Sequence, residues 1–167
     1  DDGPCVTYIG PGGSGHLVKT VHNGIEYGIE QILAEGYDLM KRVKGMTGEQ
    51  MADVFAHWNA SEELSSYLVE ITEVCLRTKD PLDGADLVEK IVDQAGQKGT
   101  GLWTVVTALK MGASVPTIYA SLNGRVMSSL KPERVKAESV FKPLPIKDFD
   151  LGSIDDGMAP LMDATVL

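Results

Sequence analysis

A row of polar residues with chemically different side chains begins at position 19. Lys19, His22, Asn23, Glu26 and Tyr27 recur at i, i+3, i+4, i+7 and i+8, which places them on one face of an α-helix. Lys, His and Glu exchange protons in catalysis, while Asn and Tyr offer neutral hydrogen-bonding groups. Lys19 and Glu26 lie two turns apart, about 10 Å along the helix axis, which leaves room for a small polar substrate. The alternative interpretation is an ordinary solvent-exposed helix face.

Two glycine-rich segments have compositions typical of anion-binding turns. Glycines at positions 10, 12, 13 and 15 would let the backbone of the first helical turn approach an anion. The second segment, 96–101, contains Lys98 before a glycine, whereas the P-loop of nucleoside triphosphate-binding proteins has its Lys after the glycine. This second segment taken alone is equally consistent with a flexible turn that carries a solvated lysine.

Three separated segments resemble the 6-phosphogluconate dehydrogenase family. Residues 10–28, with Lys-Thr-Val-His-Asn-Gly followed by Glu-Tyr-Gly, are similar to the catalytic helix of that family. Residues 95–104 resemble its substrate-phosphate loop, and residues 125–130 resemble a third segment. The three motifs occur in the expected order, and the resemblance covers about residues 4 to 141.

The resemblance implies an enzyme that oxidises 6-phospho-D-gluconate with NADP and releases carbon dioxide to give ribulose 5-phosphate. It implies that Lys19 removes the proton of the 3-hydroxyl group and that Glu26 protonates C1 of the enediol. A free lysine has a pKa of about 10.4, so Lys19 can act as a base only if burial or a positive neighbour, such as the nicotinamide, favours its neutral form. The substrate-binding residues that the resemblance implies are His22 and Asn23 for hydroxyl or carboxylate groups, Tyr27, Lys98 and Arg125 for the phosphate, and Thr100.

Helical periodicity predicts an all-α chain around these motifs. The first helix is expected over residues 15–43 and to end before Gly45. Its interior glycines at positions 24, 28 and 36 each cost about 1 kcal/mol relative to Ala, so close packing against a neighbour is expected there. The later elements are expected as a helix capped by Thr47 and Gln50, a helix capped by Asn59 or Ser61, an ambiguous segment at 86–93, and helices at 103–111, from Pro116 and from Lys131 to Phe141.

The domain organisation is expected to have three parts. Residues 1–10 include the β-prone run Cys5–Ile9 and are expected to be a residual strand and linker from a cofactor domain. Residues 11–141 are expected to form a partial helical domain for substrate binding and dimerisation. Residues 142–167, rich in Pro and Asp, are expected to form an irregular tail that departs from the family.

Composition narrows the class of protein. The 167 residues suffice for one core, and the formal net charge of −9 argues against binding to nucleic acid. No apolar run reaches the roughly 20 residues of a membrane span, so no membrane partner is expected. The two cysteines, Cys5 and Cys75, lack the spacing of a metal site and predict buried or inert thiols in a reducing, cytoplasmic environment, with an organelle as the alternative.

The expected assembly is a homodimer, and two other functions stay open. One is another β-hydroxyacid dehydrogenase, which shares the glycine-rich turn leading to Lys19 and, four residues on, Asn23. The other is a catalytically inactive helical module for binding or assembly. Because the resemblance assigns the main cofactor site to a nucleotide-binding domain before Asp1, the chain alone is expected to self-associate and to form no measurable NADPH.

Overall fold

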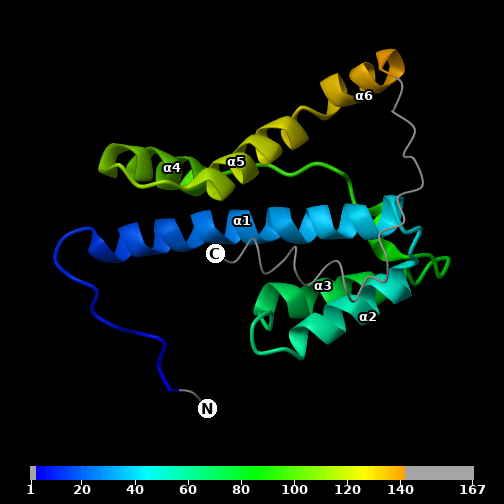
Figure 1. Ribbon diagram of the computed structural model, residues 1–167, viewed down its shortest axis with the longest axis horizontal. Helices are drawn as coiled ribbons and strands as arrows, with labels where there is room; N and C mark the ends of the chain where they lie inside the picture. Colours follow the sequence, from blue (N-terminus) through cyan, green and yellow to red (C-terminus); the bar gives the residue numbers. More distant parts are fainter. Residues whose placement is uncertain (1–2, 142–167) are drawn as a thin grey trace. The chain divides into compact units, whose positions relative to one another are not determined.

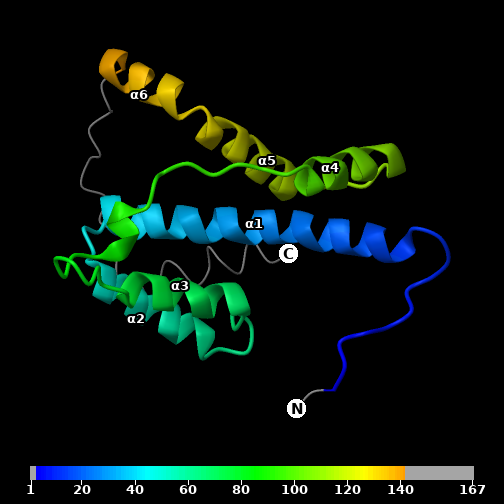
Figure 2. The same cartoon turned by 180° about the vertical axis from the view of Figure 1, so that it is seen from behind.

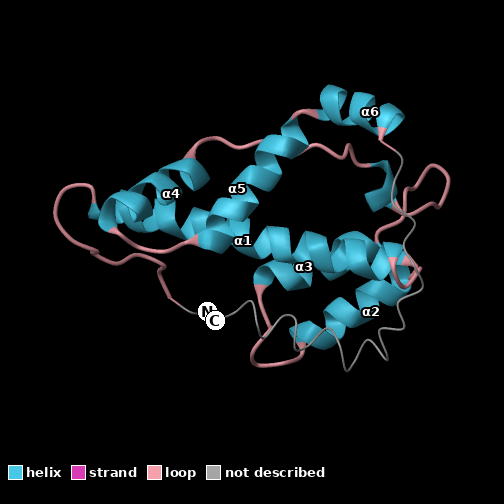
Figure 3. Ribbon diagram, turned by 45° about the horizontal axis from the view of Figure 1, so that its top comes forward, coloured by secondary structure: helices cyan, strands magenta, loops and turns pink. Residues whose placement is uncertain are grey.

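The described part of the chain, residues 3–141 of a computed structural model, is helical (Figures 1 and 3). The tail expected at 142–167 lies outside the described residues. Within them no strand is assigned, and the all-α fold class is confirmed. The elements are α1 (Ser14–Arg42), α2 (Gly48–Asn59), α3 (Tyr67–Arg77), the 3-10 helix η1 (Leu87–Lys90), α4 (Thr100–Met111), α5 (Pro116–Ser129) and α6 (Lys131–Val140).

The chain divides into two compact units. Unit 1 contains the described residues up to Gly28 together with 94–130, and unit 2 contains 29–93 together with the described residues from Lys131. The first half of α1, with α4 and α5, therefore belongs to unit 1, which includes every residue of the predicted site.

The core of unit 2 forms where α2 and α3 pack beside each other (Figures 1 and 2). Phe55 and Met51 on α2 and Leu76 on α3 are almost fully buried. The rings of Phe55 and Trp58 meet edge to face with centroids 4.9 Å apart, a favoured aromatic geometry. The α2–α3 pair thus has the apolar interface that its sequence period predicts.

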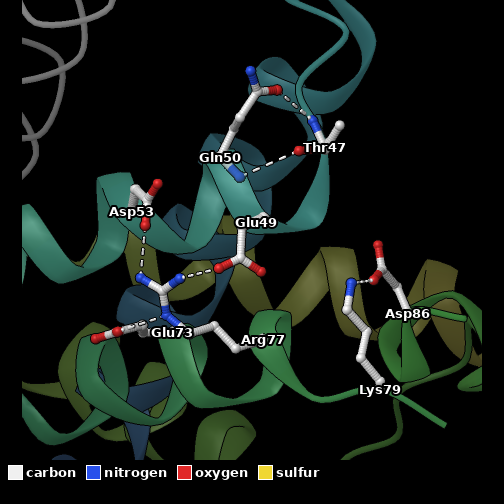
Figure 4. A network of polar contacts seen from close by, with 8 residues as sticks. All are labelled: Thr47, Glu49, Gln50, Asp53, Glu73, Arg77, Lys79 and Asp86. Atoms are coloured by element: carbon white, nitrogen blue, oxygen red, sulfur yellow. Dashed lines mark hydrogen bonds and ion pairs between the residues drawn. The ribbon is translucent and has the colours of Figure 1, made fainter. Parts of the chain in front are cut away.

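Polar contacts cap the start of α2 and link α2 to α3 (Figure 4). The Thr47 hydroxyl accepts a hydrogen bond from the Gln50 backbone N–H, and the Gln50 side chain accepts one from the Thr47 N–H, so the predicted capping box is confirmed. Figure 4 also shows Arg77 of α3 bonded to three carboxylates, with Asp53 and Glu49 of α2 at 2.8 and 2.7 Å and Glu73 at 2.9 Å. These carboxylates, Asp53 first among them, raise the pKa of Arg77 further above its usual range.

A second polar cluster joins α1 to η1 within unit 2. Glu89 accepts hydrogen bonds from Lys41 at 2.5 and 2.6 Å and from the Tyr37 hydroxyl at 2.8 Å. The bond with Lys41, followed by that with Tyr37, lowers the pKa of Glu89, and the same bond raises the pKa of Lys41. The pair is half-exposed, so it contributes modestly to stability.

Unit 1 shows the expected breaks between its helices. Gly112 ends α4 with φ 70°, a left-handed conformation that glycine adopts without strain. Pro116 occupies the first turn of α5, where its fixed φ is favourable. Val105 on α4 and Leu122 on α5 are buried.

Two local expectations are wrong. Cys5–Ile9 forms no strand, because a strand requires a hydrogen-bonded neighbour and the side chains of Val6 and Tyr8 are more than four-fifths exposed. The cap of α3 is Ser66, whose hydroxyl accepts from the Val69 N–H. Asn59 accepts a hydrogen bond from the Ser66 N–H, and Ser61 accepts one from the Leu64 N–H, so both are used in the turn before α3.

The cysteines were expected to be buried or inert. Cys5 and Cys75 are free and both are exposed, so the buried alternative does not apply. The ambiguous segment at 86–93 contains the single short helix η1. None of the described helices combines the length and the apolarity needed to cross a membrane.

Candidate functional site

The predicted acid and base lie on the same face of α1, with His22 between them. His22 Nδ1 lies 3.4 Å from Lys19 Nζ on one side and 3.3 Å from Glu26 Oε2 on the other. One imidazole nitrogen cannot accept from an ammonium group and donate to a carboxylate at once. His22 therefore bonds to Lys19 in the tautomer with a bare Nδ1, and to Glu26 when Nδ1 carries a proton. The side chains of His22 and Glu26 are 57% and 39% exposed, so both reach solvent.

Tyr27 is held between α4 and α5. A Cβ added to Gly101 of α4 would lie 2.6 Å from the Tyr27 ring, so the ring occupies the space that a side chain there would need. The guanidinium carbon of Arg125 on α5 lies 4.0 Å from the centroid of the same ring, within range of a cation–π interaction. The structure thus brings together Tyr27 and Arg125, two of the residues implied for the phosphate.

The loop that contains Lys98 is tied to α5. Arg125 Nη1 donates to the Gly96 carbonyl at 3.0 Å, and the Ala95 N–H donates to Ser128 Oγ at 2.8 Å. The Gln94 side chain donates to the Ser129 carbonyl at 2.9 Å. These three bonds connect residues about thirty positions apart and fix one end of the loop.

The other end of the loop becomes the N-terminus of α4. Gly99 caps α4 with φ 108°, a left-handed conformation. A Cβ added to Gly99 would lie 3.1 Å from the Trp103 ring, so there is little room for a side chain at this position. Lys98 is exposed immediately before this cap, and Thr100 is the first residue of α4. The first N–H groups of a helix, with its dipole, attract anions, so Lys98 and Thr100 flank a suitable place for a phosphate.

The structure places the remaining predicted residue, Asn23, half-buried on α1. It also identifies contacts that the sequence did not. Thr104 is buried against Gly24, where an added Cβ would lie 2.5 Å from Thr104 Cγ2, so the close packing expected at Gly24 is confirmed. At Gly28 the nearest atom, Thr117 Cγ2, is 3.7 Å away, an ordinary contact that does not require glycine.

Neither a nucleotide cradle nor a metal cluster occurs among residues 3–141. Dinucleotides bind at the carboxyl ends of parallel strands, and this part of the chain contains no strand. No group of three His, Cys, Asp or Glu side chains in the same range is arranged to hold a metal ion.

The chain is similar to known proteins over most of its length. It is 57% identical over 141 residues to the decarboxylating 6-phosphogluconate dehydrogenase of Synechococcus elongatus, covering 84% of this chain and 30% of that protein. It is 50% identical over 158 residues to a chloroplastic form from Arabidopsis thaliana, covering 95% of this chain and 32% of that protein.

A solved structure has a similar fold. It is that of Plasmodium falciparum 6-phosphogluconate dehydrogenase, studied in its apo form and in complex with its cofactor NADP+ and with its substrate 6-phosphogluconate. The TM-score is 0.87 at 44% identity, covering 98% of this chain and 35% of that one. The chain thus spans about a third of the length of these relatives.

The sequence also matches the family model of the 6-phosphogluconate dehydrogenase C-terminal domain. The matched residues, 15–164, extend beyond residue 141, where the resemblance was expected to end, so the expectation that the tail departs from the family is wrong. This match covers most of the chain and includes all eight predicted site residues. The chain belongs to the 6-phosphogluconate dehydrogenase family and matches its C-terminal domain.

Proposed function

We infer that the full-length protein containing this chain oxidatively decarboxylates 6-phospho-D-gluconate to ribulose 5-phosphate with NADP. The observation that carries the proposal is a convergence within unit 1. The row Lys19–His22–Glu26 continues along α1 into Tyr27, which contacts both Arg125 and the first turn of α4. The groups that exchange protons therefore lie on the same helix as Tyr27, and Tyr27 contacts the two helices, α4 and α5, that carry Thr100 and Arg125.

The phosphate end is built from positive charge and helix geometry. Arg125 lies over Tyr27 and also bonds to the Gly96 carbonyl, so its position is fixed relative to the Lys98 loop. Charge-assisted bonds from Arg and Lys to phosphate are strong, and the α4 N-terminus adds backbone donors. We assign the phosphate to Tyr27, Lys98, Thr100 and Arg125.

The proton transfers are assigned to α1. Lys19 accepts the proton of the 3-hydroxyl group, and its ammonium form then polarises the 3-keto oxygen while carbon dioxide leaves. Glu26 donates a proton to C1 of the resulting enediol. His22 and Asn23 bind the hydroxyl or carboxylate groups between them. We assign the main site of NADP, the hydride acceptor, to a nucleotide-binding domain of the full-length protein.

The proposal includes a homodimer in the cytoplasm, with an organellar form as the alternative because the Arabidopsis relative is named chloroplastic. Large apolar side chains exposed on α4 and α5, among them Trp103, Leu109 and Met127, support self-association. Light scattering of the purified protein tests the dimer. The net charge of −9 favours a small-molecule substrate over nucleic acid.

Turnover of matched substrates tests the function. The full-length protein should form NADPH from 6-phosphogluconate and much less from gluconate, which lacks the phosphate. Arg125→Met should raise KM for 6-phosphogluconate and leave the slow reaction with gluconate unchanged. Equal activity with the two substrates would instead indicate another β-hydroxyacid dehydrogenase. Binding of 6-phosphogluconate without NADPH formation by the full-length protein would indicate the inactive binding module.

A further inference from the structure

The contact between α1 and α4 in unit 1 depends on one buried hydroxyl. Thr104 is 3% exposed, and its Oγ1 lies 2.8 Å from the Thr20 carbonyl of α1 and 2.9 Å from the Thr100 carbonyl of α4. Both partners are acceptors, so the single hydroxyl proton is shared between the two helices. A burial this complete makes such a bond costly to lose.

The same side chain fits against a glycine of α1. A Cβ on Gly24 would lie 2.5 Å from Cγ2, 2.6 Å from Oγ1 and 2.7 Å from Cβ of Thr104. All three side-chain atoms of Thr104 therefore occupy the space that only glycine leaves open. Glycine in a helix interior costs about 1 kcal/mol relative to Ala, and the close approach of α4 accounts for its presence here.

In a second contact the roles are reversed: α1 supplies the side chain and α4 supplies the glycine. The Tyr27 side chain of α1 occupies the space left by Gly101 of α4, where an added Cβ would lie 2.6 Å from the ring. Gly24 and Tyr27 are three positions apart on α1, as are Gly101 and Thr104 on α4. Two side chains that each fit a glycine of the other helix fix both the separation and the register of the pair.

The two helices carry different halves of the proposed site. Lys19 and Glu26 lie on α1 within two turns of Gly24. Thr100 is the first residue of α4, one turn before Thr104, and Lys98 lies in the loop just before the Gly99 cap of that helix. On the basis of the proposed function, we propose that Thr104 is a positioning residue, which holds the phosphate-binding end of α4 at the distance that places the sugar chain against Lys19 and Glu26.

Three variants of the full-length protein measure this role. Thr104→Val keeps the shape but removes the shared proton, and should lower kcat/KM for 6-phosphogluconate about tenfold, the effect of one net hydrogen bond. Thr104→Ser restores the hydroxyl and should recover most of that loss. Gly24→Ala forces α4 away, and should lower kcat/KM on the order of 10²-fold, as misplacements of about 1 Å do.

A rescue experiment tests the contact itself. Thr104→Gly removes the three atoms that a methyl group at Gly24 would meet. The double variant Gly24→Ala/Thr104→Gly should therefore melt at a higher temperature than Gly24→Ala and regain part of its kcat/KM, whereas independent sites would add their losses. Additive losses in both measurements would overturn the proposal.

A matched control separates positioning from stability. Ser121 on α5 is 1% exposed, and among the described residues its hydroxyl donates within its own helix, to the Ile118 carbonyl at 2.7 Å. Ser121→Ala also removes a buried hydroxyl and should leave KM and kcat near the wild-type values. If Thr104→Val behaves like Ser121→Ala while the wild-type protein is active, the positioning role is refuted. If the wild-type protein forms no NADPH, the proposed function fails first, and the positioning role with it.

Discussion

Gly101→Ala is the change that acts most directly on the proposed phosphate site. The added Cβ would lie 2.6 Å from one carbon of the Tyr27 ring and 2.7 Å from the next. Carbon atoms in favourable contact are about 3.5–4.0 Å apart, so the ring or the helix must move by about 1 Å. Since Arg125 lies 4.0 Å from the centre of that ring, the displacement reaches the guanidinium group as well.

The expected loss follows from this displacement. A misplacement of about 1 Å costs on the order of 10²-fold in rate, which corresponds to about 2.7 kcal/mol of transition-state stabilisation. Steady-state NADPH formation by the full-length protein should show this loss in kcat/KM for 6-phosphogluconate. Most of it should appear in KM, because Tyr27 and Arg125 are assigned to substrate phosphate and not to proton transfer.

Gly28→Ala is the matched control. It adds the same methyl group to a buried helical glycine, but the nearest atom, on Thr117, is 3.7 Å away. Helix propensity favours Ala over Gly by about 1 kcal/mol, so this variant should be at least as stable as the wild type and nearly as active. Equal kcat/KM for Gly101→Ala and Gly28→Ala would refute the argument that the Tyr27–Gly101 contact shapes the site.

Four further variants test other parts of the molecule. Lys19→Met should lower the rates of both oxidation and decarboxylation by at least about 10²-fold, whereas Glu26→Gln should mainly slow protonation at C1. Supplying the 3-keto intermediate separates the two steps. Near-normal oxidation by Lys19→Met would contradict the assignment. The pKa of Glu89 is lowered in the folded state, so its ionised form stabilises the fold at pH values above the ordinary carboxyl pKa of about 4.3, and this stabilisation is lost as pH falls through the lower folded pKa. Glu89→Gln should therefore reduce the free energy of unfolding near neutral pH by no more than about 1 kcal/mol. The same variant should also make the melting temperature fall less steeply at acid pH. Phe55→Ala, which empties a fully buried site, should cost about 3–5 kcal/mol in urea unfolding; a loss below that of an exposed-site variant would contradict the assigned core.

The sequence by itself determined the features that depend on neighbours within one helical turn. The Thr47/Gln50 capping box, the Pro116 start of α5 and the Gly112 end of α4 all follow from local hydrogen bonds or backbone conformation. The row Lys19–His22–Glu26 is local in the same sense, since its spacing of i, i+3 and i+7 decides which face it shares. Three separated motifs were enough to identify the family.

Local signals also explain the errors. Asn59, Ser61 and Ser66 are all competent caps, and only the path of the turn selects Ser66 for α3. The β-prone residues Cys5–Ile9 favour an extended chain, but strand formation depends on a partner that a local pattern cannot reveal.

Tertiary structure decided which residues from distant segments meet. Gly24 predicted a close neighbour, but its identity, Thr104, depends on how α4 docks eighty positions later. The placement of Tyr27 between Gly101 and Arg125 likewise joins three helices. The physical reason is that a glycine's missing side chain constrains how close a neighbour can come, while the shape and register of the packed helices decide which neighbour it is.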